Sequence, residues 1–281
     1  MHLEVGYALT LAAAAGFSTW IGSIIAFFMY RPKAWVMSLM LGFSAGVMIY
    51  ISFAELLKTA IDDLGRTSAN IAFFGGIIFI ALIDILIPHE YKEEHVTDSP
   101  LIMKEVPEVD LNIRGHGYRH QYRHGEVSSV SLMRMGVLTA IGIAIHNFPE
   151  GLVTFSSAVT GNMVHGVVVA VAIGLHNIPE GISVSLPILA ATGSHKKAFF
   201  YSFISGLAEP VGALIGYLIL LPFLTPGLVS GLLAFAAGIM VYISLDELLP
   251  AAHAFGKAHM AIIGIGTGMV VMALSLILLN G

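Results

Sequence analysis

The sequence contains no cysteine and is poor in charge. Without cysteine, the chain of 281 residues can form neither a disulfide framework nor a thiolate metal site, so any metal must be bound by His, carboxylate, Asn or Met side chains. Only 11% of the residues are charged, against about 25% in soluble globular proteins, while 57% are hydrophobic. The net charge of −5 provides no basic surface for nucleic acid. These shortages exclude an ordinary soluble domain and a nucleic-acid-binding protein.

The charge that is present lies mostly in one segment. Residues His89–Val130 hold 13 of the 31 Asp, Glu, Lys and Arg residues. The rest of the chain contains eight stretches with little or no charge, each close to the roughly 20 residues that an apolar helix needs to cross a bilayer. They are Val5–Tyr30, Ala34–Leu57, Asn70–Pro88, Ser131–Ala158, Val164–Ala191, Ala198–Leu221, Gly227–Leu249 and Ala258–Leu279. The alternating pattern of barrel strands is absent, so we expect an all-α integral membrane bundle of eight transmembrane helices.

The spans and the polar segment predict the domain organisation. Residues 1–88 are expected to form transmembrane helices 1–3, residues 89–130 a loop, and residues 131–281 helices 4–8. If the N-terminus lies outside, eleven of the 13 Lys and Arg residues fall on the inner side, so the positive-inside rule places both termini outside and the loop in the cytoplasm. The loop contains five histidines, and the sequence allows either a disordered linker or a weak metal-collecting segment.

The second and seventh spans are related by an internal repeat. A shift of 192 residues superimposes Leu41–Leu57 on Leu233–Leu249, with 11 of 17 positions identical. The two spans lie an odd number of helices apart, so they cross the membrane in opposite directions and the repeat is inverted. Inverted repeats are typical of transporters that alternate access around a site at the membrane midplane.

A shorter repeat contains the candidate site. The hexapeptide His-Asn-Phe-Pro-Glu-Gly at 146–151 in the fourth span recurs as His-Asn-Ile-Pro-Glu-Gly at 176–181 in the fifth. A His and a Glu four residues apart share one helix face, so two such faces that meet would form a cation cage. The proline frees a backbone carbonyl, and the glycine allows close helix approach. Nitrogen and oxygen donors suit Zn²⁺ and neighbouring first-row divalent ions, and the candidates are His146, Asn147, Glu150, His176, Asn177 and Glu180.

The acidic residues of the spans support a cation site. Several carboxylates lie within the predicted spans, where Lys and Arg are missing from the deep positions. An unpaired buried carboxylate is costly, so these groups need cations, protons or water. Glu209 in the sixth span is expected to add a third helix to the site. Glu55, Asp246 and Glu247 lie near the ends of the repeated helices and are expected to line an entrance or an exit, whereas Asp84 fits a solvated helix end equally well.

At these residues the chain resembles the ZIP (Zrt/Irt-like) family of divalent metal transporters, and within it the bacterial members that take up zinc. The resemblance extends over essentially the whole chain, through the eight spans, the histidine-bearing loop and the paired hexapeptides. It implies a ZIP-type inverted-repeat bundle in the bacterial inner membrane, with a binuclear metal centre in helices 4–6 and a methionine from helix 2. By position, the implied metal ligands are His146, Asn147, Glu150, His176, Asn177, Glu180, Glu209 and Met48.

The resemblance also implies a mechanism. The transported substrate would be Zn²⁺, together with Fe²⁺, Mn²⁺, Co²⁺ and Cd²⁺, imported into the cytoplasm by alternating access. The motion would resemble an elevator, in which the bundle of spans one, four, five and six moves against spans two, three, seven and eight.

Two other functions stay open at this point. A membrane-embedded zinc hydrolase would also place His and Glu around a metal, although the chain has no His-Glu-x-x-His motif. A divalent cation exporter or exchanger on a related scaffold would differ from an importer only in the direction in which the metal moves and in the ion gradient that drives it. We expect no enzymatic activity and no catalytic cofactor, with divalent metal ions and the lipid bilayer as partners. The sequence leaves open whether the functional unit is a homodimer.

Overall fold

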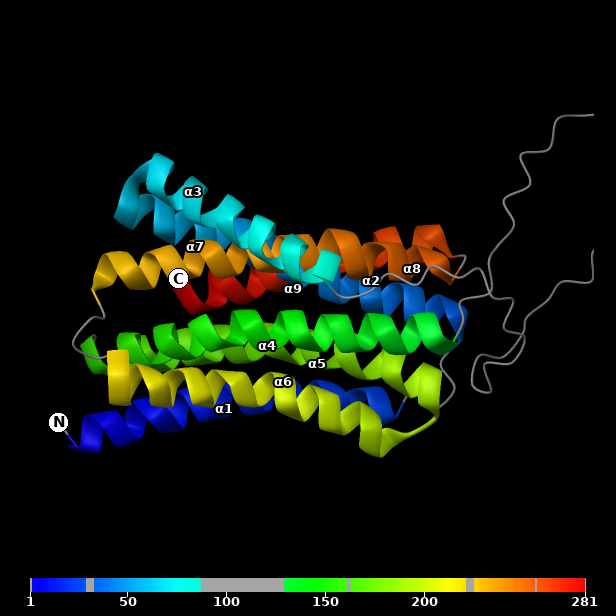
Figure 1. Ribbon diagram of the computed structural model, residues 1–281, viewed down its shortest axis with the longest axis horizontal. Helices are drawn as coiled ribbons and strands as arrows, with labels where there is room; N and C mark the ends of the chain where they lie inside the picture. The colour runs from blue at the N-terminus through cyan, green and yellow to red at the C-terminus, as the bar shows by residue number, and fades with distance from the viewer. Residues whose placement is uncertain are drawn as a thin grey trace, which may run out of the picture.

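The protein is helical throughout the part of the chain that the computed structural model describes (Figure 1). Residues 2–28, 33–86, 129–160, 163–220, 225–255 and 257–280 are described, and no strand occurs among them. The expected all-α fold is confirmed, whereas the predicted loop 89–130 lies almost entirely outside the described residues. The helices are α1 (His2–Phe27), α2 (Ala34–Ile51), α3 (Leu57–Leu86), α4 (Ser129–Thr160), α5 (Met163–Thr192), α6 (His195–Ile215), α7 (Pro226–Ile243), α8 (Leu249–Ala254) and α9 (Ala258–Asn280), and the π-helices are η1 (Ser52–Leu56), η2 (Gly216–Leu220) and η4 (Ser244–Leu248).

Large apolar side chains project from the outer surface of the helices. Ile71 and Ile85 of α3 are each 70% exposed, and Leu278 of α9 is 83% exposed. A soluble monomer would not leave such faces open to water, but a bilayer covers them. The chain is a multi-pass membrane protein whose outer surface contacts lipid.

The number of continuous helical spans differs from the expected eight. Seven stretches of the described residues are long and apolar enough to cross a membrane, because the second and third predicted spans fall in one stretch, Ala34–Ile85, of 52 residues. A straight helix of that length would extend over about 78 Å, more than twice the roughly 30 Å hydrocarbon core. Gly65 interrupts it with φ 78° and ψ 159°, which is not helical. Figure 1 shows the chain turning at the start of α3 and running back along α7.

Gly65 provides a test of this turn. Its positive φ is a conformation that residues with a Cβ rarely adopt, and no atom lies within 4 Å of the position that a Cβ would take. We expect Gly65→Ala to destabilise the protein by about 1–2 kcal/mol through backbone strain alone. Thermal unfolding in detergent measures the change. Gly75→Ala, which also adds a Cβ in open space but in a regular helix, is the matched control, and equal melting temperatures would contradict the turn.

Two of the helices begin with side-chain caps. The turn after α5 contains Gly193 at φ 65°, followed by Ser194, whose hydroxyl accepts a hydrogen bond from the Lys197 amide at the start of α6. Thr225 accepts a hydrogen bond from the Leu228 amide in the same way, and α7 follows with proline in its first turn. These caps fix where α6 and α7 start.

The helices form two bundles, one above the other in Figure 1. The site bundle consists of α1, α4, α5 and α6, which pack closely on one another. The scaffold bundle consists of α2, α3, α7, α8 and α9, with α2 against α9 and α3 against α7. The bundles meet where α4 packs on α7 and α2 packs on α5. This division places the same spans together as the elevator arrangement implied by the family resemblance.

The inverted repeat extends to an irregular feature of the backbone. The repeat-related segments α2 and α7 run in opposite directions, and each continues into a π-helix at the equivalent position, η1 or η4. In both copies the first serine of the π-helix donates a hydrogen bond to a methionine carbonyl: Ser52 to Met48 at 2.6 Å and Ser244 to Met240 at 2.7 Å. Because π-turns are rare and occur mostly at functional positions, their agreement supports a true structural repeat.

Candidate metal centre

The residues of the two hexapeptides are brought together at the centre of the site bundle. His146, Asn147 and Glu150 come from α4, and the equivalent residues of the second hexapeptide come from α5. All six side chains are completely buried, and so is Glu209 of α6. The structure therefore places seven of the eight sequence-predicted ligands in the interior of one bundle.

Each histidine pairs with the glutamate of the other hexapeptide. His146 Nε2 lies 2.9 Å from Glu180 Oε1, and His176 Nε2 lies 3.2 Å from Glu150 Oε2. The spacing of the motif predicts that His and Glu of one helix share a face, and the two faces do meet. The sequence did not show that the contacts would be crossed. Crossing makes the centre nearly two-fold symmetric, with an imidazole and a carboxylate from different helices on each side.

The backbone sets the orientation of both imidazole rings. His146 Nδ1 donates to the Gly142 carbonyl at 3.1 Å, and His176 Nδ1 donates to the Ala172 carbonyl at 3.2 Å, each one turn earlier in its own helix. With Nδ1 donating to the backbone, Nε2 is the nitrogen that faces the carboxylate of the other hexapeptide, and a cation that replaces the proton of that contact would be bound by both groups. Metal-binding histidines are commonly held by such a backbone contact. Both rings are thus positioned to bind a cation through Nε2.

The asparagines connect the centre to neighbouring helices. Asn177 Nδ2 donates to Glu209 Oε2 at 2.8 Å and to the Ala15 carbonyl of α1 at 2.9 Å. Asn147 Nδ2 donates to the Ser205 carbonyl of α6 at 3.3 Å. Since their NH₂ groups are used in this way, the amide oxygens are left as donors to a cation. Glu209 thereby joins the centre, as expected for a third helix.

Some of the buried oxygens in this centre have no hydrogen-bond partner within the described part of the chain. Burying such acceptors unsatisfied is costly, and carboxylate oxygens are the most costly of them. A divalent cation satisfies several oxygens at once, which hydrogen bonds within the protein do not achieve here. The buried oxygens without a hydrogen-bond partner among the described residues are Asn147 Oδ1, Asn177 Oδ1, Glu180 Oε2 and Glu209 Oε1.

The glycine that ends each hexapeptide lets another helix approach closely. A Cβ at Gly151 would lie 1.9 Å from the Glu209 carbonyl oxygen of α6, and one at Gly181 would lie 1.8 Å from the Thr19 carbonyl oxygen of α1. Only a residue without a side chain fits either contact. The expected close approach is confirmed at both positions, and the helix that approaches Gly181 is α1, the first span of the bundle that the family resemblance implies.

Met48 occupies a different place from the other candidates. It is completely buried, but it belongs to the scaffold bundle and packs in a large apolar cluster to which both bundles contribute. The connection to the centre runs through Ser44, one turn earlier in α2, which donates a short hydrogen bond to the Pro179 carbonyl inside the second hexapeptide. This bond joins the two bundles directly at the motif, and nothing in the spacing of the sequence indicated Ser44.

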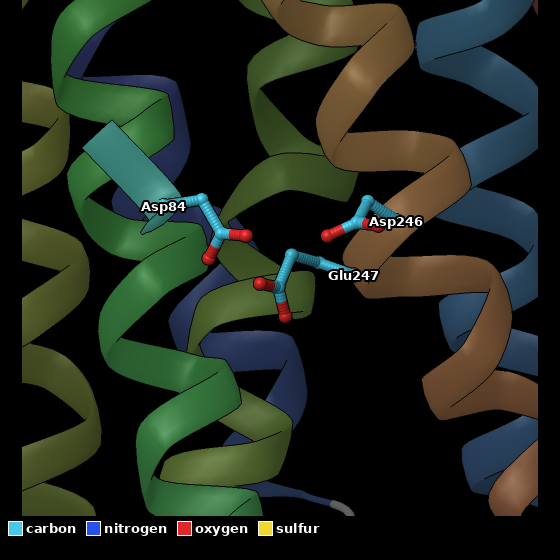
Figure 2. A group of neighbouring side chains, drawn as sticks. All are labelled: Asp84, Asp246 and Glu247. Carbon is cyan, nitrogen blue, oxygen red and sulfur yellow. The ribbon is translucent and has the colours of Figure 1, made fainter. Parts of the chain in front are cut away.

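A second acidic group lies outside the hexapeptides (Figure 2). Asp84 of α3 and Asp246 and Glu247 of η4 each direct a carboxylate oxygen into one place, with these oxygens within 4.8 Å of one another. The Tyr242 hydroxyl donates to Asp84 Oδ2 at 3.2 Å. The sequence already indicated an entrance or exit for Asp246 and Glu247, but Asp84 could be assigned only once the helices were placed.

Comparison with known proteins agrees with this geometry. A family model described as ZIP Zinc transporter matches residues 59–276. A protein named Zinc transporter ZupT from Clostridium perfringens is 47% identical, over 96% of this chain and 95% of its own. Proteins of the same name from Streptococcus mutans and Campylobacter jejuni are 48% and 49% identical, each over 99% of this chain and 98% of their own. The family and these relatives are transporters and not enzymes, which argues against the hydrolase alternative.

Proposed function

This chain belongs to the ZIP family of zinc transporters, and we propose that it imports Zn²⁺ into the bacterial cytoplasm through the metal centre of the site bundle. The crossed contacts of His146 with Glu180 and of His176 with Glu150 carry the proposal. They place two imidazoles and two carboxylates, all fully buried, around one point within a membrane-spanning bundle. Such a donor set suits borderline divalent ions better than alkali or alkaline-earth ions. The metal is the substrate of transport here.

The number of donors supports a binuclear centre. Zinc in proteins takes about four ligands, and three protein ligands suffice where water completes the set. The site bundle supplies more than that: two imidazole nitrogens, two amide oxygens and three carboxylates. We assign His146, Asn147, Glu150, His176, Asn177, Glu180 and Glu209 to two adjacent ions, with Met48 contributing from the scaffold bundle.

The arrangement of the bundles supports alternating access. The ligands of the hexapeptides all lie in the site bundle, while the inverted repeat of α2 and α7 lies in the scaffold bundle. Movement of the first bundle along the second would expose the centre to one membrane face and then to the other. We infer that both termini face outward and that residues 89–130 lie in the cytoplasm. Figure 1 supports one element of this orientation, since α1 begins and α9 ends at the same end of the molecule.

The donor chemistry also supports a broad range of metals. Imidazole and carboxylate ligands accept Fe²⁺, Mn²⁺ and Co²⁺, and a thioether extends the range towards Cd²⁺. We propose Zn²⁺ as the main substrate and these ions as secondary substrates. Competition of each ion with zinc uptake ranks them.

Flux in sealed vesicles tests the proposed function. The purified protein is reconstituted in proteoliposomes that contain a zinc-sensitive dye, and Zn²⁺ is added outside or loaded inside. Entry down the zinc gradient, faster than in protein-free vesicles, is expected. A hydrolase would move no zinc, and an exchanger would require a gradient of the opposing ion. Absence of zinc flux under all gradients would refute the proposed function.

The acidic group at η4 predicts a separate effect on turnover. We propose that Asp84, Asp246 and Glu247 receive the ion as it leaves the centre on the side opposite the termini. Glu247→Gln removes a charge from this group without altering the crossed pairs, so maximal zinc flux is expected to fall about tenfold with a smaller change in half-saturating zinc concentration. Initial rates over a range of zinc concentrations separate the two quantities. A change in the half-saturating zinc concentration alone, with maximal flux unaltered, would contradict a role of this acidic group in releasing the ion.

A further inference from the structure

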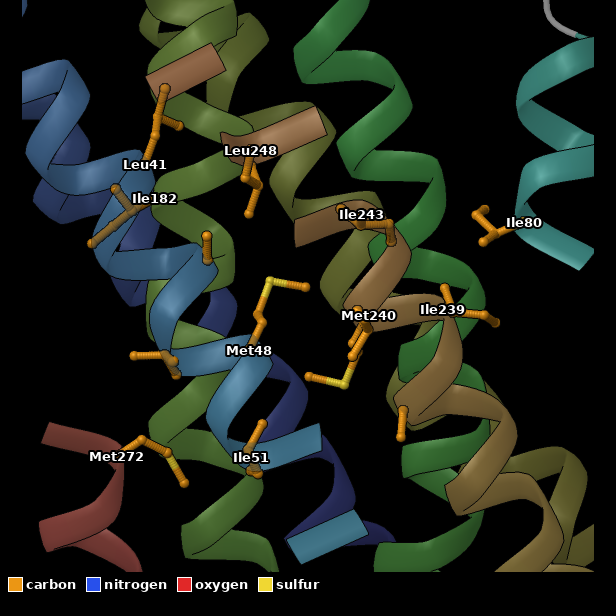
Figure 3. Close-up of a cluster of buried hydrophobic side chains, with 14 of the residues drawn as sticks. Leu41, Met48, Ile51, Ile80, Ile182, Ile239, Met240, Ile243, Leu248 and Met272 are labelled. Atoms are coloured by element: carbon orange, nitrogen blue, oxygen red, sulfur yellow. The ribbon is translucent and has the colours of Figure 1, made fainter. Parts of the chain in front are cut away.

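Two methionines occupy equivalent positions of the inverted repeat. Met48 of α2 and Met240 of α7 are both completely buried. The two copies differ at six of the 17 aligned positions, but both have methionine here. Figure 3 shows both side chains in one buried cluster, in the space between α2 and α7. A thioether can fill space or bind a soft metal ion. The position of each methionine along its helix, compared with the height of the metal centre, bears on which role it has.

Met48 lies level with one of the crossed pairs. The hydrogen bond from Ser44 to the Pro179 carbonyl fixes the place where α2 crosses α5. The two helices run in opposite directions, so one turn forward along α2 corresponds to one turn back along α5. The first step leads from Ser44 to Met48, and the second leads from Pro179 to His176. Met48 is therefore at the height of the pair formed by His176 and Glu150.

A different contact places Met240 level with the other pair. The Ile243 side chain fills a notch at Gly142 of α4, where a Cβ would lie 2.3 Å from Ile243 Cδ1. Helices α4 and α7 also run in opposite directions. One turn back along α7 leads from Ile243 to Met240, while one turn forward along α4 leads from Gly142 to His146. Met240 is therefore at the height of the pair formed by His146 and Glu180.

Each methionine is also followed by an acidic residue towards one face of the membrane. Glu55 comes seven residues after Met48, and Glu247 comes seven residues after Met240, about 10 Å further along each helix. Because α2 and α7 run in opposite directions, the two glutamates lie towards opposite faces. Met240 thus lies beside the part of the metal centre that is nearer the acidic group of Glu247, and Met48 has the equivalent place on the other side.

We propose that Met240 is a thioether ligand of the transported ion on the side of the centre nearer Glu247, equivalent to Met48 on the opposite side. The inference rests on the proposed function. A thioether favours soft ions such as Cd²⁺ and contributes little to hard ions such as Mn²⁺. Met240 therefore affects which metals pass as well as how the bundles pack.

Relative uptake of a soft and a hard ion tests the proposal. In proteoliposomes, Met240→Leu is expected to lower the ratio of Cd²⁺ to Mn²⁺ uptake about tenfold, the effect typical of losing one partner of a metal site. Leucine has nearly the volume of methionine, so Mn²⁺ uptake should persist and report correct folding. Met272→Leu is the matched control: Met272 is buried in the same cluster on α9, and its replacement should leave the ratio unchanged. Equal ratios in the two variants would overturn the proposal.

X-ray absorption at the cadmium edge gives a readout that does not depend on transport. The chain has no cysteine, so sulfur next to bound Cd²⁺ in the purified protein must come from methionine. Sulfur scattering is expected to remain in Met48→Leu and to disappear in the double variant Met48→Leu/Met240→Leu. Its complete loss in Met48→Leu alone would refute a role for Met240. Failure of wild-type vesicles to accumulate either metal would instead refute the proposed function, and the spectra would still decide the question of the ligand.

Discussion

Replacing Glu180 with alanine should abolish zinc accumulation in reconstituted vesicles. The variant loses both the oxygen that lies 2.9 Å from His146 Nε2 and Oε2, a buried oxygen without a hydrogen-bond partner among the described residues. A carboxylate of the centre contributes more than an outer contact of a metal site, so zinc uptake should fall by about 100-fold or more. Initial rates of zinc entry, normalised to the amount of reconstituted protein, measure the loss.

The control for this experiment removes an acidic residue elsewhere. Asp62 forms an exposed ion pair with Lys58 at 2.9 Å on α3, and exposed pairs of this kind contribute less than about 1 kcal/mol. Asp62→Ala should therefore transport zinc as the wild type does. Wild-type uptake by Glu180→Ala would remove the basis for assigning the site.

Adding a methyl group at Gly181 should have the largest effect on stability. Its Cβ would lie 1.8 Å from the Thr19 carbonyl oxygen, and the two helix backbones that meet there have no flexible side chain to move aside. Gly22 of α1 is equally restricted, since its own Cβ would lie 2.1 Å from the Ile178 carbonyl oxygen. Gly181→Ala must therefore push α1 away from α5, at a cost of about 3 kcal/mol or more.

Thermal unfolding in detergent tests this prediction directly. The matched control is Gly266→Ala in α9, where no atom lies within 4 Å of the added Cβ. That variant should gain about 0.5–1 kcal/mol, because alanine is the better helix former. If both variants melted at the wild-type temperature, the proposed contact between α1 and α5 would be wrong.

Much of the metal centre could be predicted from the sequence because the residue spacing that identifies it lies within single helices. A His and a Glu four residues apart define a helix face without reference to any other helix, and repetition of the hexapeptide indicates a second face. Glu209 was found by its rarity, as an acidic residue deep in an apolar span. The membrane class followed from composition, which depends on no contacts at all.

The features that sequence reasoning missed depend on how helices are placed relative to one another. The crossed pairing of the hexapeptides, the hydrogen bond from Ser44 to Pro179 and the place of Asp84 beside Glu247 all join residues that are distant in the chain. The number of continuous apolar stretches differs from the eight predicted spans for another reason. The turn at Gly65 lies inside one helical stretch, so the second and third predicted spans are joined there without a loop between them.

The matched π-helices bear on the history of the chain. A π-turn contains one residue more than an α-turn, so η1 and η4 each record an insertion into a regular helix. Both insertions occupy the same aligned position of the two copies, beginning at Ser52 and at Ser244. A single insertion in a common ancestor explains this more simply than two separate events. On that reading the extra residue was present in the ancestral half before its two copies came to cross the membrane in opposite directions within one chain.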